Sequence, residues 1–385
     1  MNTVVLDVWD PESGATWDNT VRTILSSQDT KLILWAPQEW ALGWNLENIM
    51  PARDRFILLK QLRTHMINHN VEIVYVYGSV SGTRYPYINN TGVDSPLLAN
   101  EETWLPGTIH RWPTYWLQSG ISNYIYNSDR TWPYRYSEFN QLFVCMQSRP
   151  HVHRLYLQDQ LYQSGLLYKN HCSWNVLASD YYNNPGAIYN FEHWDEHQMI
   201  IDSQLHSHSH GTGLCTSVLS RSDPVNYTGC FMDLISESST ESCFITEKSV
   251  KPLLSHKPFL IVGAVGIHAA MADLGFELYD EIFDYSFDTI TDSAERIDAI
   301  VCQLAQLQLR YEQGSLQLYP AYMQLLPKLH RNFVRLHEIV VNHELMPDFV
   351  KHNPDLFPKV PQIFHAANDL KHADWVQQFI KSDNS

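Results

Sequence analysis

The chain has 385 residues, of which 44% are hydrophobic and 18% are charged, a composition typical of a globular protein with a sizeable core. Its 26 lysine and arginine residues are outnumbered by 42 aspartate and glutamate residues, so the formal net charge is −16. This balance argues against a broad surface that coats nucleic acid, because such a surface needs clustered basic side chains. The length exceeds that of one typical core and favours two domains.

The six cysteines form no Cys-x-x-Cys pair, so we expect reduced thiols and neither a disulfide framework nor a zinc ribbon. The first residues lack the basic start and apolar core of a signal peptide. The longest apolar run, near residues 259–267, is too short to span a bilayer. We therefore expect a cytoplasmic protein with no membrane partner.

Apolar, β-branched and aromatic runs at residues 3–8, 31–36 and 72–77 predict three strands in the first third of the chain. Residues 51–69 carry apolar side chains at helical spacing and predict a helix. This alternation of strand and helix is typical of a parallel sheet with helices on its faces.

A second alternation begins with a strand at residues 142–146 and a helix at 152–161. Strands at 232–235 and 259–262, with a helix at 246–255 between them, continue the pattern. The predicted fold class is therefore α/β, with two Rossmann-like domains.

Helices are predicted for the rest of the chain. Asp292, with Glu295 three residues later, has the form of a capping box, and Pro327 is expected to open a further helix. A last helix is expected at residues 369–380. The predicted organisation is an N-terminal domain, a second domain and a helical tail that packs back on both, with the bounds 1–135, 140–320 and 321–385.

Four residues at the start of the predicted helix 246–255 form the sharpest candidate site: Thr246, Glu247, Lys248 and Lys251. The N–H groups and the dipole at a helix start favour phosphate oxygens, and lysine adds a positive charge. Since a carboxylate repels phosphate, Glu247 and the upstream Glu237 are expected to accept hydrogen bonds from sugar or ribose hydroxyls. The combination predicts a site for a nucleoside diphosphate that carries a sugar; the alternative is an ordinary capped surface helix. Pro252 requires this helix to restart near Ser249 or to kink.

Two further segments could contribute to such a site. Gly263 begins a short turn from strand to helix, where backbone N–H groups can approach phosphate, although no full GxGxxG motif is present. Arg149, His153 and Arg154 lie where a predicted strand gives way to a helix. Ligands of open α/β sheets bind at the carboxyl ends of strands, and an arginine there can grip a diphosphate.

The order Ser236-Glu237-Ser238, then Ile245-Thr246-Glu247-Lys248, resembles the donor-binding region of fucosyltransferase-type glycosyltransferases. It resembles more closely the glycosyltransferase-like proteins of tailed phages and environmental sequences. The similarity covers roughly residues 140–300 and continues through these segments: Arg149 to Arg154, Lys251-Pro252, Pro258-Phe259, Leu274-Gly275-Phe276 and the acidic run 280–288.

The resemblance implies the two-domain architecture called GT-B, with a nucleotide-diphosphate sugar as donor and no tightly bound cofactor. It implies transfer that inverts the anomeric carbon and needs no metal. Lys248 and Arg154 would neutralise the departing diphosphate, and residues 140–320 would form the donor domain.

A general base that activates the acceptor hydroxyl is expected in the N-terminal acceptor domain, near the carboxyl end of a strand. The candidates are Asp10, Glu12 and Glu39, each of which could instead be a plain loop carboxylate. The acceptor is a glycan or, alternatively, a hydroxymethylated base in phage DNA held in a local basic cleft. The residues considered for that cleft are Arg53, Arg55, Lys60, Arg63, Arg84 and Arg111. A further alternative is a catalytically silent module that only binds the nucleotide sugar.

Two clusters of residues could bind a metal ion, although neither sequence pattern is specific for a metal site. His206, His208 and His210 alternate as ligands on one face of a strand would, but the serine and glycine around them indicate a loop. The second cluster could supply oxygen ligands for Mg²⁺ and consists of Asp280, Glu281, Asp284 and Asp288. The simpler interpretation is the solvent-exposed start of a helix.

Overall fold

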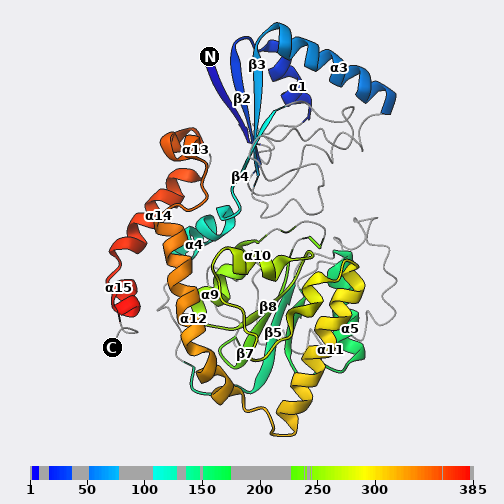
Figure 1. Ribbon diagram of the computed structural model, residues 1–385, viewed down its shortest axis with the longest axis vertical. Coiled ribbons are helices and arrows are strands. Elements are labelled where there is room, and N and C mark those ends of the chain that lie inside the picture. Colours follow the sequence, from blue (N-terminus) through cyan, green and yellow to red (C-terminus); the bar gives the residue numbers. More distant parts are fainter. Residues whose placement is uncertain are drawn as a thin grey trace. The chain divides into compact units, whose positions relative to one another are not determined.

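The computed structural model describes residues 2–7, 17–36, 52–77, 107–127, 136–147, 151–174, 227–237, 239–240, 243, 245–357 and 359–381. The chain forms two compact units (Figure 1). Unit 1 consists of Met1–Ser119 and Ile339–Phe379, and unit 2 consists of Gly120–Glu338 and Ile380–Ser385. The first division thus falls earlier than the predicted one near residues 135–140, and the predicted tail 321–385 is shared between the units.

Unit 1 is built on a parallel four-stranded sheet in the order β1-β2-β3-β4. The strands are β1 (Asn2–Asp7), β2 (Thr30–Ala36), β3 (Val71–Tyr77) and β4 (Thr108–Arg111). The first three confirm the predicted strands, and α3 (Ala52–Asn68) confirms the predicted helix. The short strand β4 was not predicted.

Helices cover one face of this sheet. Each strand is added on the same side of the previous one, and strand–helix–strand connections are right-handed, so successive connecting helices fall on the same face. Figure 1 shows α1 (Trp17–Ser26) and α3 together on that face. The core between them consists of Ile24, Leu32, Leu34, Leu62, Met66, Val71, Ile73 and Tyr75.

The opposite face is covered by a segment far along the chain. It comprises α13 (Asp348–His352), η3 (Pro354–Leu356) and α14 (Val360–His372). Its buried residues Met346, Val350, Phe357, Val360 and Ile363 pack with Ile33, Trp35, Val74, Val76, Trp112 and Tyr115. The carbonyl of Glu344 also accepts hydrogen bonds from Thr114 Oγ1 at 2.6 Å and Gln118 Nε2 at 2.9 Å.

Unit 2 contains a second parallel sheet, in the order β6-β5-β7-β8. Its strands are β5 (Gln141–Gln147), β6 (His171–Trp174), β7 (Cys230–Ser236) and β8 (Phe259–Val262). Figure 1 shows α5 (Val152–Gln163) and α11 (Ser293–Glu312) on one face, with α9 (Val250–Ser255) and α12 (Leu318–Val341) on the other. Both units are therefore of the predicted α/β class, with parallel sheets.

The helical predictions for the C-terminal part are confirmed at one place and wrong at two. Asp292 caps α11 as predicted, because its Oδ1 accepts from the N–H groups of Ala294 and Glu295 at 2.8 and 2.9 Å. Pro327, however, lies inside α12 and does not open a helix. The helix continues because its buried side chains on both sides of the proline outweigh the lost backbone hydrogen bond: Tyr322, Leu325, Leu329, Phe333 and Leu336.

The predicted last helix is two helices, α14 and α15 (Asp374–Lys381). Ala373 between them has an extended backbone, with φ −70° and ψ 115°, which ends the helical hydrogen bonding. Within the described residues, no helix combines the length and the apolarity that crossing a bilayer requires.

The packing of the C-terminal segment predicts its effect on unit 1. Ile363→Ala should lower the free energy of unfolding by about 2–5 kcal/mol, because the side chain is fully buried against the sheet. Ile67→Ala, the same change at a side chain that is 80% exposed on α3, should change it by less than about 0.5 kcal/mol. Urea unfolding of both variants measures the difference, and equal losses would contradict the assigned packing.

Candidate functional site

The strand order of unit 2 makes one edge of the sheet the expected position of a ligand site. From β5 the chain crosses to β6 on one side, whereas β7 and β8 lie on the other side. At such a reversal the connections leave on opposite faces, and a crevice remains outside the carboxyl ends of the two central strands. Here those ends are Gln147 of β5 and Ser236 of β7.

The first turn of α5 holds the carboxyl end of β7. Arg154 Nη2 donates to the carbonyl oxygens of Ser236 and Glu237, both at 3.1 Å, and His153 Nε2 lies 2.9 Å from the Glu237 oxygen. Arg154 is only 3% exposed. The structure thus brings Arg154 to the predicted site, where its guanidinium positions the backbone of β7.

The same edge carries a compact ionic cluster, which we call the Glu237 cluster and which consists of Glu237, Thr246 and Lys248. The fully buried Glu237 carboxylate accepts from Thr246 N at 3.0 Å and from Thr246 Oγ1 at 2.6 Å. Lys248 Nζ donates to Thr246 Oγ1 at 2.9 Å and lies 3.4 Å from Glu237 Oε2. The single hydroxyl of Thr246 therefore donates a hydrogen bond to the Glu237 carboxylate and accepts one from the Lys248 ammonium.

Thr246 also begins the local helix. It is the N-cap of the 3₁₀ helix η1 (Glu247–Ser249), and its side chain accepts from Lys248 N. A separate α-helix, α9, starts at Val250, with Ser249 at its N-cap position. Of the two predicted alternatives, a restart near Ser249 or a kink, the structure shows the restart. Pro252 lies in the first turn of α9. The N–H groups of a first turn have no partner within the helix, so proline costs no helical hydrogen bond there.

The exposure of these side chains separates their roles. Lys248 and Glu247 keep 18% and 16% of their side chains exposed, and Lys248 Nζ lies 3.6 Å from Glu247 Oε1. Thr246 is 1% exposed and Glu237 is fully buried. Of the predicted residues in this segment, Lys248 and Glu247 can therefore touch a ligand directly, whereas Thr246 and Glu237 hold them.

Lys251 lies in the interior of unit 2. Its Nζ is 3.6 Å from the centre of the Tyr227 ring and 3.8 Å from Met146 Sδ. Lys257 is equally buried; it donates to the Cys230 carbonyl and lies 4.6 Å from the centre of the Tyr136 ring. Burial raises the pKa of Asp233, and the charges of Lys251 and Lys257 oppose that rise.

In the glycine turn, the Gly263 carbonyl and the Gly266 N–H group form hydrogen bonds within the protein. The Gly263 carbonyl accepts from Arg296 Nε at 3.1 Å and from Arg296 Nη2 at 2.9 Å. A Cβ on Gly263 would come within 2.7 Å of Ile267 Cδ1, so a larger residue here would require the Ile267 side chain to shift. Gly266, at φ +75°, donates its N–H to the Asp288 carbonyl at 2.9 Å and precedes α10 (Ile267–Asp273).

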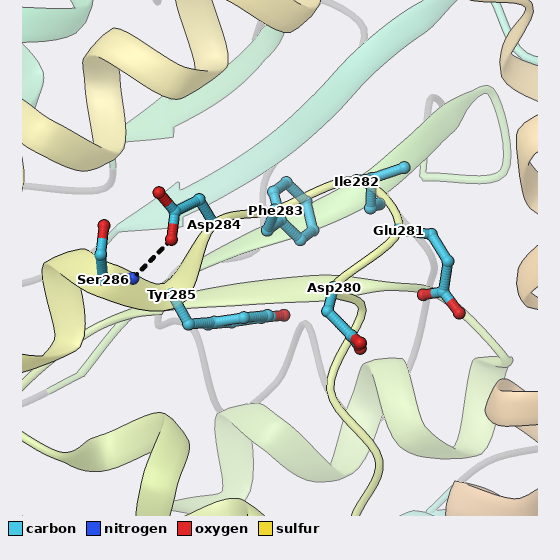
Figure 2. A pocket seen from close by; sticks show the side chains of 7 residues that line it. All are labelled: Asp280, Glu281, Ile282, Phe283, Asp284, Tyr285 and Ser286. Carbon is cyan, nitrogen blue, oxygen red and sulfur yellow. Dashed lines mark hydrogen bonds between the residues drawn. The ribbon is translucent and has the colours of Figure 1, made fainter.

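The acidic run does not converge on a common point. Figure 2 shows the Asp284 carboxylate turned back to Ser286 N, at 2.9 Å, and the Asp280 and Glu281 carboxylates at the other end of the pocket. Lys328 Nζ binds both of the latter, at 2.6 and 2.9 Å. Across the part of the chain that the structure describes, no three His, Cys, Asp or Glu side chains are grouped as a metal site requires.

Several predicted residues lie outside the described residues. They are Asp10, Glu12, Glu39, Arg84, Arg149, His206, His208 and His210. Four basic residues considered for DNA belong to α3, namely Arg53, Arg55, Lys60 and Arg63, and Arg111 ends β4.

Sequence reasoning missed the buried polar residues Asp233, Lys257 and Arg296. The sequence alone could have revealed Asp233 as a buried, paired residue, because a carboxylate inside an otherwise apolar strand requires a buried partner. Its lysine partners could not be chosen from sequence, since Lys257 lies 24 residues further along the chain.

Comparison of the chain with protein-family models, curated proteins and solved structures finds no match in any of the three.

The Glu237 cluster predicts a specific role for one hydroxyl. Thr246→Val should lower the free energy of unfolding by about 1–3 kcal/mol, because buried Glu237 loses a hydrogen bond and η1 loses its cap. Thr246→Ser keeps the hydroxyl and should recover most of this loss. Urea unfolding of the two variants is the measurement, and an equally damaging serine would show that the methyl group, and not the hydroxyl, stabilises this edge.

The environment of His153 predicts a pH dependence of stability. Removal from water, and next the charge of Arg154, lower the pKa of His153 from 6.5 to about 3. Between these values the unfolded chain binds a proton that the folded protein does not, so stability is fully present above pH 6.5 and is lost as the pH falls. By pH 5 this histidine should account for a loss of about 2 kcal/mol.

His153→Gln should therefore flatten the stability profile between pH 6.5 and 5, measured by urea unfolding at each pH. His372→Gln, at an exposed position at the end of α14, serves as the control. An unchanged profile in His153→Gln would contradict the assignment.

Proposed function

We propose that this chain is a nucleotide-sugar-dependent glycosyltransferase with the two-domain GT-B organisation. Unit 2 would bind the nucleotide-diphosphate sugar at the carboxyl ends of β5 and β7, and unit 1 would bind the acceptor. The observation that carries the proposal is the position of Lys248, held by Glu237 and Thr246 at the edge where the strand order reverses. The sequence resemblance to fucosyltransferase-type enzymes covers this same segment.

The residues divide the binding task between them. Lys248 would contact the diphosphate, and the nearby start of α5 adds the positive end of a helix dipole. Glu247 would accept hydrogen bonds from hydroxyls of the sugar or the ribose. Arg154, His153, Glu237 and Thr246 would fix the backbone and side chains that make these contacts.

The transfer itself needs a base and a stabilised leaving group. The acceptor oxygen attacks the anomeric carbon while a carboxylate takes the hydroxyl proton, and the bond from that carbon to the diphosphate oxygen breaks. The diphosphate leaves with the bonding electrons, and Lys248 offsets its charge. Asp10, Glu12 and Glu39 remain the candidates for the base, and inversion follows from the resemblance.

A glycan is the first candidate for the acceptor, and a hydroxymethylated DNA base is the second. The second is favoured by α3, which carries Arg53, Arg55, Lys60 and Arg63 within 17 residues. A base in a duplex would have to be flipped out. Electrophoretic retardation of duplex DNA at low and moderate salt distinguishes the two acceptors.

The proposal predicts selective stabilisation by nucleotide sugars. One of the UDP, GDP or CMP sugars should raise the melting temperature of the protein and be slowly hydrolysed, because ligand binding favours the folded state. Lys248→Ala should abolish the shift, whereas Lys371→Ala, a matched change at an exposed residue of α14, should leave it intact. Binding without hydrolysis would favour a silent module, and no shift with any nucleotide sugar would rule out the donor site.

A further inference from the structure

A glycine lies in the interior of a helix that packs against the candidate site. The helix is α4 (Tyr115–Asn127), and the glycine is the buried Gly120. Glycine weakens a helix interior relative to alanine, because its backbone loses more conformational freedom on folding. A glycine at this position therefore needs a local reason.

The close approach of α4 to the start of η1 and α9 supplies that reason. A Cβ on Gly120 would lie 3.0 Å from Val250 Cγ2, 3.2 Å from Glu247 Cβ and 3.5 Å from Glu247 Cα. Carbon atoms in contact are best separated by about 3.5–4.0 Å, so the first two distances are too short. An alanine at position 120 would have to displace Val250 or Glu247 by a few tenths of an ångström.

Of these two neighbours, Glu247 is the one with room to move. Val250 is fully buried and begins α9, in which every residue is buried. Glu247 is the first residue of η1 and keeps 16% of its side chain exposed. The added methyl group would therefore displace Glu247.

Resting on the proposed function, we infer that Gly120 is a positioning residue, which sets the place of the Glu247 carboxylate for the hydroxyls of the sugar or the ribose. Lys248 is held by other contacts, since its Nζ donates to Thr246 Oγ1 at 2.9 Å and lies 3.4 Å from Glu237 Oε2. Its 3.6 Å distance to Glu247 Oε1 is the longest of the three. A displacement of Glu247 would thus disturb the binding of hydroxyls more than the binding of the diphosphate.

This division predicts a selective loss of affinity. Gly120→Ala should weaken the binding of the preferred nucleotide sugar by roughly 3- to 10-fold, the effect of one impaired hydrogen bond. The affinity for inorganic pyrophosphate, which has no hydroxyl-bearing sugar, should change by less than about twofold. The melting temperature of the ligand-free protein should change by less than about 3 °C, because the gain in helix propensity offsets the short contact.

A double-mutant cycle tests whether Gly120 acts through Glu247. Glu247→Ala should weaken the binding of the nucleotide sugar by roughly 10-fold, because the ligand hydroxyl loses its acceptor. Adding Gly120→Ala to this variant should cause less than about a twofold further loss, whereas independent effects would multiply.

Ser119→Ala is the matched control on the same helix. It raises helix propensity without adding an atom, and adjacent residues of a helix do not share a face. It should leave every affinity unchanged.

Isothermal titration of the whole chain provides the measurement, together with melting curves. The probes are UDP-glucose, GDP-fucose and ADP-glucose, then UDP, GDP and ADP, and inorganic pyrophosphate. A loss in Gly120→Ala that a nucleotide sugar shares with its nucleoside diphosphate would support the inference, with the ribose hydroxyls at Glu247. A loss confined to the nucleotide sugar would support it with the sugar hydroxyls there.

The remaining outcomes contradict the inference at separate levels. Unchanged affinities in Gly120→Ala or Glu247→Ala, an equal loss for pyrophosphate, or effects that multiply in the double variant would overturn the role of Gly120. A large fall in the melting temperature of Gly120→Ala, or its failure to fold, would show that the close approach serves general packing, and would overturn that role as well. If the unaltered protein binds none of the nucleotide sugars or diphosphates, the proposed function itself fails, and the inference fails with it.

Discussion

The right-handed connection between parallel strands determines both the architecture and the place of the candidate site. In unit 1 the strands follow one another in a single direction, so α1 and α3 fall on one face and leave the other bare. That face, which includes Ile33, Trp35 and Val76, is buried by residues from 346 onward. In unit 2 the direction reverses at β5 and β7, so helices cover both faces, and the strand ends at this reversal are where open α/β sheets generally bind ligands. The right-handedness of the connections thus explains why a C-terminal segment covers one face of the unit 1 sheet, and why the candidate site is expected at the strand ends of unit 2.

The site is held by buried ionic contacts, which require complete pairing. The Glu237 carboxylate receives three donors, from Thr246 N, Thr246 Oγ1 and Lys248 Nζ, and this pairing permits its burial. Deeper in the unit, Asp233 has Tyr227 Oη at 3.3 Å and the charges of two lysines close by. The deeper contacts fix α9 against the sheet, and the outer ones leave Lys248 partly exposed. A ligand at this edge would therefore meet a pre-positioned charge.

The local sequence pattern was sufficient to predict elements that bury a continuous apolar run. It failed where residues distant in sequence determine whether a segment forms a strand or whether a side chain is buried. The first three strands of unit 1 and the cap at Asp292 followed from their own neighbourhoods. β4 has only four residues, Thr-Ile-His-Arg, and carries no alternation that could reveal it. The sequence predicts Lys251 beside Lys248 in the candidate site, but its Nζ lies against Tyr227 and Met146, which are distant in sequence. The sequence could therefore indicate the segments that form the candidate site, but not which of their charged side chains face solvent.

The His268–Asp288 pair illustrates why geometry must decide chemical roles. Burial would raise the pKa of Asp288, but hydrogen bonds from His268 and Ala269 outweigh it and lower that pKa. His268 Nδ1 lies 2.9 Å from Asp288 Oδ1, as in a catalytic dyad, yet its Nε2 accepts from the Ile261 N–H at 3.1 Å. Nε2 therefore has no lone pair left for a substrate, and Nδ1 donates to the carboxylate. This histidine joins α10 to β8, and the base that the proposed transfer needs must come from other residues, for which the carboxylates after β1 and β2 remain the candidates.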